Sequence, residues 1–423
     1  MKVTRVFAFM ALAGLAGSAY ATNGYFGHGY GMKAKGMAGA STASSDSAFG
    51  GANNPASMAY AGDRFELGVD LFSPIREASN TNFGGGGAVK SESDSNYFLV
   101  PELGYNKMVN TNLALGVTVY GNGGMNSNYK PLPGFGGANL LGGNGRLGVD
   151  LMQLVIAPTA AFKIAPEHSI GVSPLLGYQR FKAEGLQGFG IMNGAGGNLG
   201  YDDSFGYGVR VGYMGKIMPT VTVGAAYASK MRFDEFSKYA GLFAEQGGFD
   251  IPSNYNLGVA WQATPAVKLA LDYQRINYSD VKSIANATAT MAAFGADNGP
   301  GFGWEDTKVW KLGMEYKYTP KLTLRAGYSY TNSPIKGDMT CLTQNCAEAT
   351  INILAPAVIK DHATLGFTYT LASGNELTMA YMHAFENDVS GVRPASFNNG
   401  VAGSVDTIKM YQNSLGIQYS WKM

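Results

Sequence analysis

Apolar and polar residues alternate strictly at the end of the chain. In Tyr411–Met423, the residues Leu415, Ile417, Tyr419 and Trp421 are interleaved with polar or small ones. A strand places successive side chains on opposite faces, so this segment predicts one apolar and one polar face. A run of about ten such residues is typical of a lipid-facing strand in a closed transmembrane barrel.

The same alternation recurs along most of the chain, for example in Trp310–Tyr318 and Leu322–Tyr330. It predicts an all-β fold, a transmembrane antiparallel β-barrel of about fourteen strands, because single-chain bacterial barrels have an even number. The predicted strands are Arg64–Ile75, Asn96–Met108, Leu113–Gly121, Val149–Ile164, Ser169–Ala183, Phe205–Gly215, Val221–Phe233, Tyr255–Gln262, Val267–Asn277, Lys308–Tyr318, Leu322–Asn332, Ala363–Leu371, Glu376–Phe385 and Lys409–Trp421. A water-soluble β-sandwich with one buried face also alternates, but it leaves the Tyr-rich strand ends unexplained.

The connections between these strands alternate in length. Short links such as Thr319–Lys321 and Ala372–Asn375 are typical of periplasmic turns, and long ones such as Asn122–Gly148 and Asp234–Asn254 are typical of extracellular loops. An even number of strands then puts both ends of the barrel chain on the periplasmic side.

Residues 1–21 are predicted to be a secretory signal peptide. Lys2 and Arg5 precede an apolar run from Val6 to Gly17, and Ala19-Tyr20-Ala21 has the small-x-small pattern of a cleavage site. No later stretch approaches the ~20 continuous apolar residues that a membrane-spanning helix needs. An exported chain of alternating strands is expected in the bacterial outer membrane.

Composition fits a barrel and narrows the partners. Charged residues are 14% of the chain, below the ~25% of a soluble domain. The net charge of +1 gives no argument for a nucleic-acid partner. The expected partners of such a barrel are outer-membrane lipids and the barrel assembly machinery, and the chain is expected to be a monomer without cofactor or metal; the hydrophobic small molecules expected as further partners follow from the resemblance described below.

Residues 22–62, between the predicted signal and the barrel at 63–423, are rich in Gly, Ala and Ser. The segment is too weakly periodic for a strand and too polar for the membrane. It can fold inside the barrel lumen as a plug, or hatch, or it can extend as a flexible periplasmic tail. Composition does not decide between these two hypotheses.

Two blocks of the chain carry a family resemblance. The first comprises Gly36-Met37-Ala38-Gly39-Ala40, Ser44-Ser45-Asp46-Ser47-Ala48 and Asn54-Pro55-Ala56. The second comprises Trp304–Thr307, Trp310–Tyr316 and Leu322–Tyr330. These blocks resemble the N-terminal hatch and a strand pair of the outer-membrane long-chain fatty acid transporter family, the FadL-like proteins, which include aromatic hydrocarbon transporters.

The resemblance implies passive uptake of hydrophobic compounds, such as long-chain fatty acids or related hydrocarbons. In that account an extracellular groove captures substrate, a lumenal pocket holds it, and hatch movement opens a lateral exit through the barrel wall. It assigns hatch gating to Asn54, Pro55 and Ala56, where Pro55 fixes φ and Asn54 can bond nearby backbone. A turn of purely structural use is the alternative.

Tyr25 and Phe26 are expected to reach the lumenal pocket, as an early aromatic residue of the family does. The lateral opening is expected at Gly121, Gly123 and Gly124, because glycines after the third strand permit a bulge or an inward bend. A plain transition from strand to loop explains the same glycines.

The capture groove is expected at apolar residues in two long loops. Phe236, Tyr239 and Phe243 have amphipathic helical spacing, which is unusual in an exposed loop. The groove residues are Leu186, Phe189, Ile191, Phe236, Tyr239, Leu242 and Phe243. The alternative is that these loops pack on each other as a lid with no ligand role.

Other classes of function find less support in the sequence. A general diffusion porin for small polar solutes is the alternative function, but it needs no plug and would want a charged constriction. An enzyme is not expected, because only His383 of the four histidines has a position compatible with an outer-membrane lipase. Cys341 and Cys346 are expected to form a local disulfide in a loop, since a metal site would want further Cys or His nearby.

Overall fold

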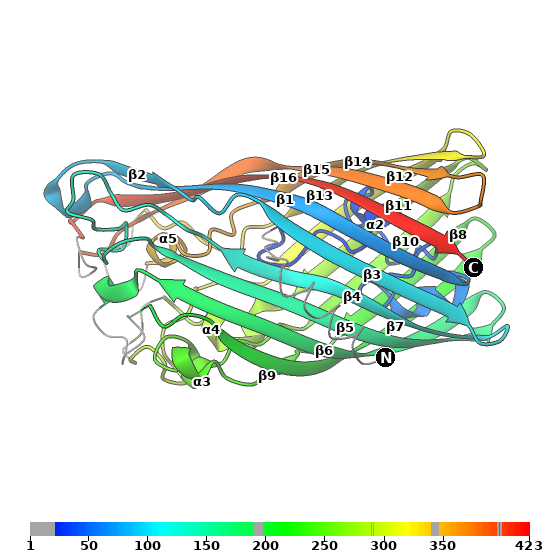
Figure 1. Ribbon diagram of the computed structural model, residues 1–423, viewed down its shortest axis with the longest axis horizontal. Coiled ribbons are helices and arrows are strands. Elements are labelled where there is room, and N and C mark those ends of the chain that lie inside the picture. Colours follow the sequence, from blue (N-terminus) through cyan, green and yellow to red (C-terminus); the bar gives the residue numbers. More distant parts are fainter. Residues whose placement is uncertain are drawn as a thin grey trace.

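A computed structural model describes residues 22–189, 198–288, 290, 292–339, 347–395, 397 and 400–423. Sixteen strands form one antiparallel sheet, and all of them except the short β2 (Val89–Glu92) and β9 (Arg232–Phe233) close into a fourteen-strand barrel (Figure 1). The barrel strands are β1 Arg64–Asn80, β3 Phe98–Met108, β4 Leu113–Asn126, β5 Gly148–Ala165, β6 His168–Glu184, β7 Asp202–Met218, β8 Val221–Ala228, β10 Asn254–Gln262, β11 Val267–Ile276, β12 Thr307–Lys317, β13 Leu322–Thr331, β14 Asp361–Thr370, β15 Glu376–Val392 and β16 Val405–Lys422. Sequence neighbours pair around the ring, and β1 closes it on β16 from Arg64↔Lys422 to Asn80↔Asp406. The predicted fold class and strand number are confirmed.

The alternation of the sequence sets the two faces of the wall. On β12, Trp310 and Leu312 are about half exposed on the outer face, whereas Lys311 and Glu315 are buried toward the lumen. Apolar side chains facing outward avoid burying polar groups in lipid, and inward polar groups find partners within the barrel. The barrel interior is therefore rich in charged residues although the whole chain has few.

Several strands extend beyond their predicted ends. β1 continues to Asn80 instead of Ile75, and β15 continues to Val392 instead of Phe385. These extensions carry polar residues on both faces, so the hydrophobic pattern stops while the hydrogen-bond ladder continues. The predicted strand Val221–Phe233 is divided into β8 and β9 because the Ser229 hydroxyl, and not a backbone carbonyl, accepts the N–H of Val209.

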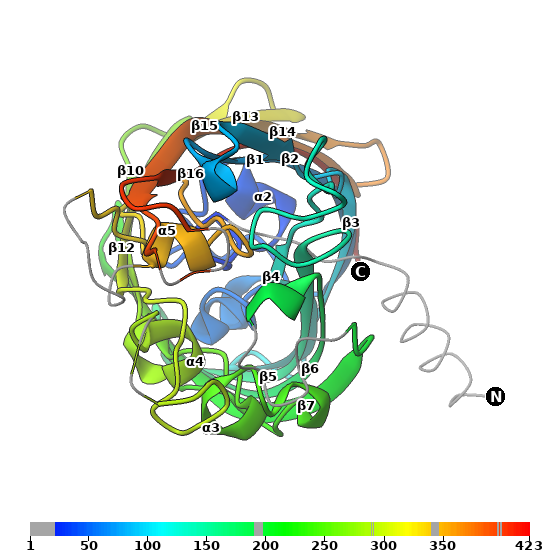
Figure 2. The same ribbon diagram turned by 90° about the vertical axis from the view of Figure 1, so that its left-hand side faces the viewer.

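The two ends of the barrel differ. Short turns join the strands at the end where the C-terminus lies (Figure 1). Loops with short helices cover the opposite end (Figure 2). These helices are α3 Ala244–Gly247, α4 Lys282–Ala285, α5 Glu348–Ile351 and the 3₁₀ turns η2 Phe83–Gly85, η3 Leu186–Phe189, η4 Ser237–Tyr239 and η5 Tyr278–Asp280.

None of the helices in the described ranges has the length and apolar character needed to cross a bilayer.

The N-terminal region Thr22–Gly62, called the hatch below, lies inside the barrel and not as a periplasmic tail (Figure 1). Its helix α2 (Met32–Lys35) packs against β14, β15 and β16, and its 3₁₀ helix η1 (Pro55–Tyr60) packs against β4 to β7. Two small elements of one segment thus contact opposite parts of the wall.

Glycines on the lumenal face of the strands make room for the hatch. A Cβ atom on Gly212 of β7 would lie 2.0 Å from the Asn54 Oδ1 atom, and one on Gly327 of β13 would lie 2.4 Å from the carbonyl carbon of Met37. Apart from Gly123, which is described below, a Cβ atom on nine wall glycines would lie within 3 Å of a hatch atom: Gly104, Gly116, Gly171, Gly212, Gly224, Gly258, Gly313, Gly327 and Gly416. We call them the glycine belt. Hatch atoms approach the backbone of the wall strands closely at these positions, which explains why these strands contain so many glycines.

Candidate functional site

Buried ion pairs tether the hatch to the wall. Lys35 of α2 contacts Asp70 of β1 at 2.9 Å and Glu102 of β3 at 3.5 Å, and Lys33 contacts Glu376 of β15 at 2.8 Å. These side chains are almost completely shielded from solvent, where a charge is costly unless it is paired. The pairs therefore fix where α2 sits against three strands.

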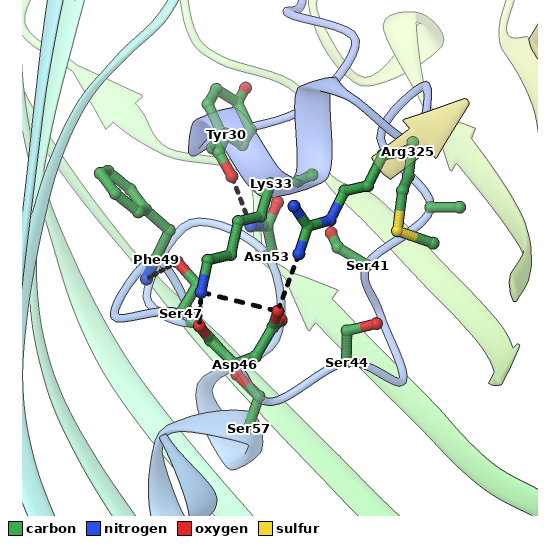
Figure 3. Close-up of a pocket in the computed structure, with 14 residues that line it drawn as sticks. Tyr30, Lys33, Ser41, Ser44, Asp46, Ser47, Phe49, Asn53, Ser57 and Arg325 are labelled. Carbon is green, nitrogen blue, oxygen red and sulfur yellow. Dashed lines mark hydrogen bonds and ion pairs between the residues drawn. The ribbon is translucent and has the colours of Figure 1, made fainter. Parts of the chain in front are cut away.

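A small polar cavity of about 20 Å³ lies on the hatch between α2 and β13 (Figure 3). Asp46, whose side chain is 40% exposed, contacts Lys33 at 3.7 Å and Arg325 at 3.5 Å across this cavity. Arg325 also pairs with Glu315 of the neighbouring β12 at 2.7 Å. Hatch and wall thus share one charge network here.

Wall carboxylates also bind the hatch backbone. The Asp272 Oδ2 atom accepts the N–H groups of Ser41 and Thr42, both at 2.8 Å. Glu66 accepts the N–H of Ala48 at 2.7 Å and the Ser47 hydroxyl at 2.7 Å. Such bonds satisfy backbone groups in a segment with little regular structure.

The Asn54-Pro55-Ala56 turn lies against β6 and β7. The Asn54 amide donates to the carbonyls of Thr42 at 2.8 Å and Tyr213 at 2.9 Å, and its oxygen accepts the N–H of Ala56 at 3.1 Å. β6 and β7 pair without interruption from His168↔Gly215 to Phe181↔Asp202. The turn therefore anchors the hatch on an intact part of the wall, and its gating role stays a prediction.

The wall is interrupted elsewhere, between β3 and β4. Their pairing ends at Leu103↔Val119, so residues 98–102 of β3 and 120–126 of β4 are not paired with each other. The pairing of β4 with β5 shifts between Gly121 and Gly123, which leaves Asn122 as the extra residue of a β-bulge. We call this unpaired stretch the gap. The predicted glycines Gly121, Gly123 and Gly124 all lie at its β4 edge.

The start of the hatch occupies the free edge of β4. Phe26 forms an isolated β-bridge with Gly123, the N–H of Gly124 donates to the Tyr25 carbonyl at 3.2 Å, and the N–H of Gly27 donates to the Asn122 carbonyl at 3.3 Å. A Cβ on Gly123 would lie 1.8 Å from the Tyr25 carbonyl oxygen. Tyr25–Gly27 thus replaces β3 as the partner of β4.

Tyr25 and Phe26 are buried among loop aromatics. The Tyr25 ring centroid lies 5.4 Å from that of Tyr278, 6.0 Å from that of Trp304 and 6.2 Å from that of Phe249. We call these five residues the inner aromatic cluster. Burial raises the pKa of Tyr25, so its hydroxyl stays neutral in this apolar setting.

Three members of this cluster, Phe249, Tyr278 and Trp304, were not predicted from the sequence as pocket residues. Phe249 comes from the loop before β10, and Tyr278 and Trp304 come from the two ends of the loop between β11 and β12. Trp304 falls in the second family block, which was the one available signal for it.

The predicted capture residues form a second group below the loop surface. Phe236, Tyr239 and Phe243 pack around Phe181 of β6, with ring centroids 5.8, 4.7 and 4.8 Å away. We call these four residues the lid cluster. All three loop aromatics are buried, so the prediction that they are exposed is wrong.

The remaining predicted capture residues divide into two groups. Leu186 and Leu242 are also buried. Ile191 and the Phe189 side chain lie outside the described residues, as do Cys341 and Cys346. The helical spacing predicted one amphipathic helix here, and this was wrong. η4 and α3 are separate short turns, and Glu245 and Gln246 of α3 have positive φ. The loops pack on each other, as the lid alternative stated.

The lid cluster touches the inner aromatic cluster. The Phe243 ring centroid lies 4.9 Å from that of Phe249, which in turn is 6.2 Å from that of Tyr25. A continuous apolar path therefore runs from beneath the loops to the residues that line the gap.

Comparison with known proteins agrees with this architecture. A family model described as outer membrane protein transport protein (OMPP1/FadL/TodX) matches residues 13–407. Among curated proteins, none matches the sequence.

Solved structures share the fold at low sequence identity. A Pseudomonas aeruginosa FadL homologue superposes with a TM-score of 0.70 at 17% identity, covering 94% of this chain and 99% of the other. The P. putida toluene transporter TodX gives 0.68 at 19% identity with the same coverage. The Ralstonia pickettii toluene transporter TbuX gives 0.63 at 15% identity, again covering 94% and 99%. At these identities the likeness shows the fold alone.

Proposed function

Because the chain belongs to the OMPP1/FadL/TodX family of outer membrane transport proteins, we propose that it carries hydrophobic compounds inward through a lateral exit in the barrel wall. The protein is a bacterial outer-membrane β-barrel of a transport family, not an enzyme. The observation that carries the proposal is the gap, which is occupied by Tyr25–Gly27 of the hatch and not by a strand.

The proposed route begins at the loops. The lid cluster is buried, so substrate enters when the loops above it separate. Its aromatic rings then offer an apolar surface that continues into the inner aromatic cluster. Burying an apolar molecule between such rings is favourable by roughly 25 cal/mol for each Å² removed from water.

The exit step is a displacement of Tyr25–Gly27 from β4. Two backbone hydrogen bonds, which together form the Phe26–Gly123 bridge, hold this segment on β4. A ligand that packs on the inner aromatic cluster competes with the contacts of Tyr25 and so favours the displaced state. The gap then opens toward lipid, so the substrate leaves without crossing the charged hatch.

The proposal has two candidate substrate classes, monoaromatic hydrocarbons and long-chain fatty acids. TodX and TbuX are described as toluene transporters and CymD as a monoaromatic hydrocarbon channel. The five aromatic residues of the inner cluster favour a planar ring, but they also suit an alkyl chain of a long-chain fatty acid.

The test is uptake in cells that lack their own transporter. Labelled toluene, a labelled long-chain fatty acid and a small sugar are compared between cells with and without this chain. We expect faster entry of at least one hydrophobic compound and no gain for the sugar. A gain for the sugar alone would identify a diffusion porin instead.

Lateral exit is tested by deleting Asn122. Without this extra residue, β4 has one register along β5 and can continue straight beside β3. We expect hydrophobic uptake to fall at least tenfold, with sugar entry unchanged as evidence that the hatch still plugs the lumen. Deleting Ile164, the extra residue of the bulge between Lys163 and Ala165, is the matched control. Equal uptake by both deletion variants would exclude the gap as the exit.

A further inference from the structure

A second polar cavity of about 20 Å³ lies inside the barrel, between the hatch and the wall. Arg210 of β7, Asn254 and Asn256 of β10, Gln274 of β11 and Lys311 of β12 line its wall side. Backbone and side chains of the hatch, including Phe26 and Asn53, line the other side. The volume corresponds to one or two water-sized particles.

Two cations border this cavity without a carboxylate partner. Arg210 is 3% exposed and Lys311 is 6% exposed, and neither forms an ion pair within the described part of the chain. The Arg210 Nη1 atom donates to the Gly51 carbonyl at 3.3 Å, the Arg210 side chain also interacts with the Tyr120 hydroxyl, and its Nε atom has no hydrogen-bond partner. Lys311 donates to the His28 carbonyl at 3.1 Å.

This arrangement differs from that of four other buried cations, since Lys33, Lys35, Arg325 and Arg393 each contact a carboxylate within 3 Å. Buried Arg76 of β1 donates to the Ser95 carbonyl and does not line this cavity. The carboxylate that acts electrostatically on Lys311 is that of Asp272. Its Oδ2 atom already accepts two hatch N–H groups. A buried charge without a counter-ion is strongly unfavourable, so an anion bound beside these two cations would stabilise them.

We propose that this cavity is a binding site for a small monovalent anion, chloride under ordinary conditions, held between Arg210 and Lys311. The neighbouring carboxamides of Asn254, Asn256 and Gln274 can turn N–H groups toward it. Chloride matches the volume, whereas a carboxylate attached to a substrate chain requires more room than the cavity has.

The anion reaches the site from the periplasmic side. The cavity of Figure 3 shares Tyr30, Ser41 and Asn53 with this one, and its rim includes the 40% exposed side chain of Asp46. The Asn53 amide donates to the Tyr30 carbonyl at 2.9 Å, and both residues line both cavities. A small ion passes by side-chain rotation there.

Bound chloride joins hatch and wall. The cavity has hatch residues on one side and strands β7, β10, β11 and β12 on the other, so an anion within it stabilises the docked hatch. Anything that binds only the docked state raises its stability according to its concentration and affinity.

The direct test uses the unaltered protein. Crystals grown in bromide in place of chloride should give an anomalous peak between the Arg210 guanidinium and the Lys311 ammonium group. Absence of that peak at full bromide replacement overturns the proposal.

A solution test separates a true site from ion binding at crystal concentration only. Thermal unfolding in detergent is followed in chloride and in gluconate at equal ionic strength. We expect a saturable rise of the midpoint by roughly 2 °C or more in chloride.

Arg210→Gln should remove the chloride effect, and Arg232→Gln, at an exposed cation on β9, should keep it. An equal chloride effect in both variants, or none in the unaltered protein, contradicts the proposal.

Discussion

The Asn54 side chain makes three hydrogen bonds, one to the wall and two within the hatch. It donates to Thr42 and Tyr213 and accepts from Ala56, and it is completely buried. Replacing it with Ala leaves two buried carbonyls with fewer donors, which costs about 1–3 kcal/mol. The ion pairs of Lys33 and Lys35 remain, so the hatch stays inside the barrel.

We therefore expect Asn54→Ala combined with Pro55→Gly to slow hydrophobic uptake while barrel assembly remains normal. The measurements are labelled uptake and heat-modifiable gel mobility. Asn110→Ala, in an exposed turn, is the control because its side chain bonds only the local backbone. Unchanged transport in the double variant would remove the gating role of the turn.

Arg393 and Asp406 form a fully buried pair among the extracellular loops. The guanidinium contacts both carboxylate oxygens at 2.8 Å and the Leu140 carbonyl at 2.8 Å. Asp406 also accepts from Asn80 at 2.8 Å and from Thr350 at 2.6 Å. One ion pair thus ties together four separate segments.

Arg393→Met should destabilise the loops by about 3–5 kcal/mol, because it leaves the Asp406 charge buried and unpaired. Protease cleavage of the loops on intact cells is expected to rise. Adding Asp406→Asn should restore much of the resistance, since it removes the uncompensated charge. Resistance that stays lost in the double variant would mean that packing, and not charge, holds the loops.

At the scale of elements, the strands were predictable and the loops were not. Lipid on one side of the wall forces the alternation seen in Trp310–Tyr318, so sequence alone located each barrel strand. The loop aromatics are buried by partners far away in the chain, as Phe236 is by Phe181, and no local pattern reports such contacts. Spacing in Phe236–Phe243 therefore suggested an exposed helix that does not form.

The hatch was predictable in part. Resemblance located Asn54-Pro55-Ala56 and Tyr25, but their places in the barrel came only from the structure. The glycine belt was missed because glycine in a strand pattern usually indicates a turn or a bulge. The need for glycine at these positions comes from the hatch, which packs on them from the lumen and is distant in the sequence.

The segment Tyr25–Gly27 acts as a substitute strand, and Tyr278 holds it. The Tyr278 hydroxyl accepts the N–H of Tyr25 at 3.1 Å and donates to the Asn23 carbonyl at 2.6 Å. Tyr278→Phe removes both bonds but keeps the ring contacts, so the segment should leave the gap more easily by about 1–3 kcal/mol.

We expect Tyr278→Phe to raise the initial rate of hydrophobic uptake several-fold and to leave sugar entry unchanged. Tyr227→Phe, on the lipid face of β8, is the control. A slower rate in Tyr278→Phe would show that this segment guides substrate and does not block it.

For the whole molecule, the hatch separates two functions that one barrel can have. An empty fourteen-strand barrel lined by Glu66, Asp70, Glu102, Arg210 and Asp272 is a polar channel. With the hatch docked, polar solutes meet a filled lumen, and the route proposed above takes hydrophobic ones to the gap. The porin alternative thus describes the same wall without its plug.

That relation can be tested through the glycine belt. Cβ atoms on Gly171, Gly212 and Gly224 would lie 2.4, 2.0 and 2.1 Å from hatch atoms. Valine at all three positions fits a strand well but prevents Thr42, Asn54 and Pro55 of the hatch from docking on β8, β7 and β6. We expect the triple variant to assemble and to admit a small sugar in liposome swelling, whereas the unaltered protein does not.

Ala363→Val adds bulk on the outer face of β14 and should leave the hatch docked, which makes it the matched control. The triple variant should also lose the preference for hydrophobic compounds, because substrate no longer needs the gap. An assembled triple variant that still excludes sugar would mean that the loops, and not the hatch, close the lumen. In that case the glycines serve only to bring the hatch close, and selectivity must be assigned to the extracellular end of the barrel.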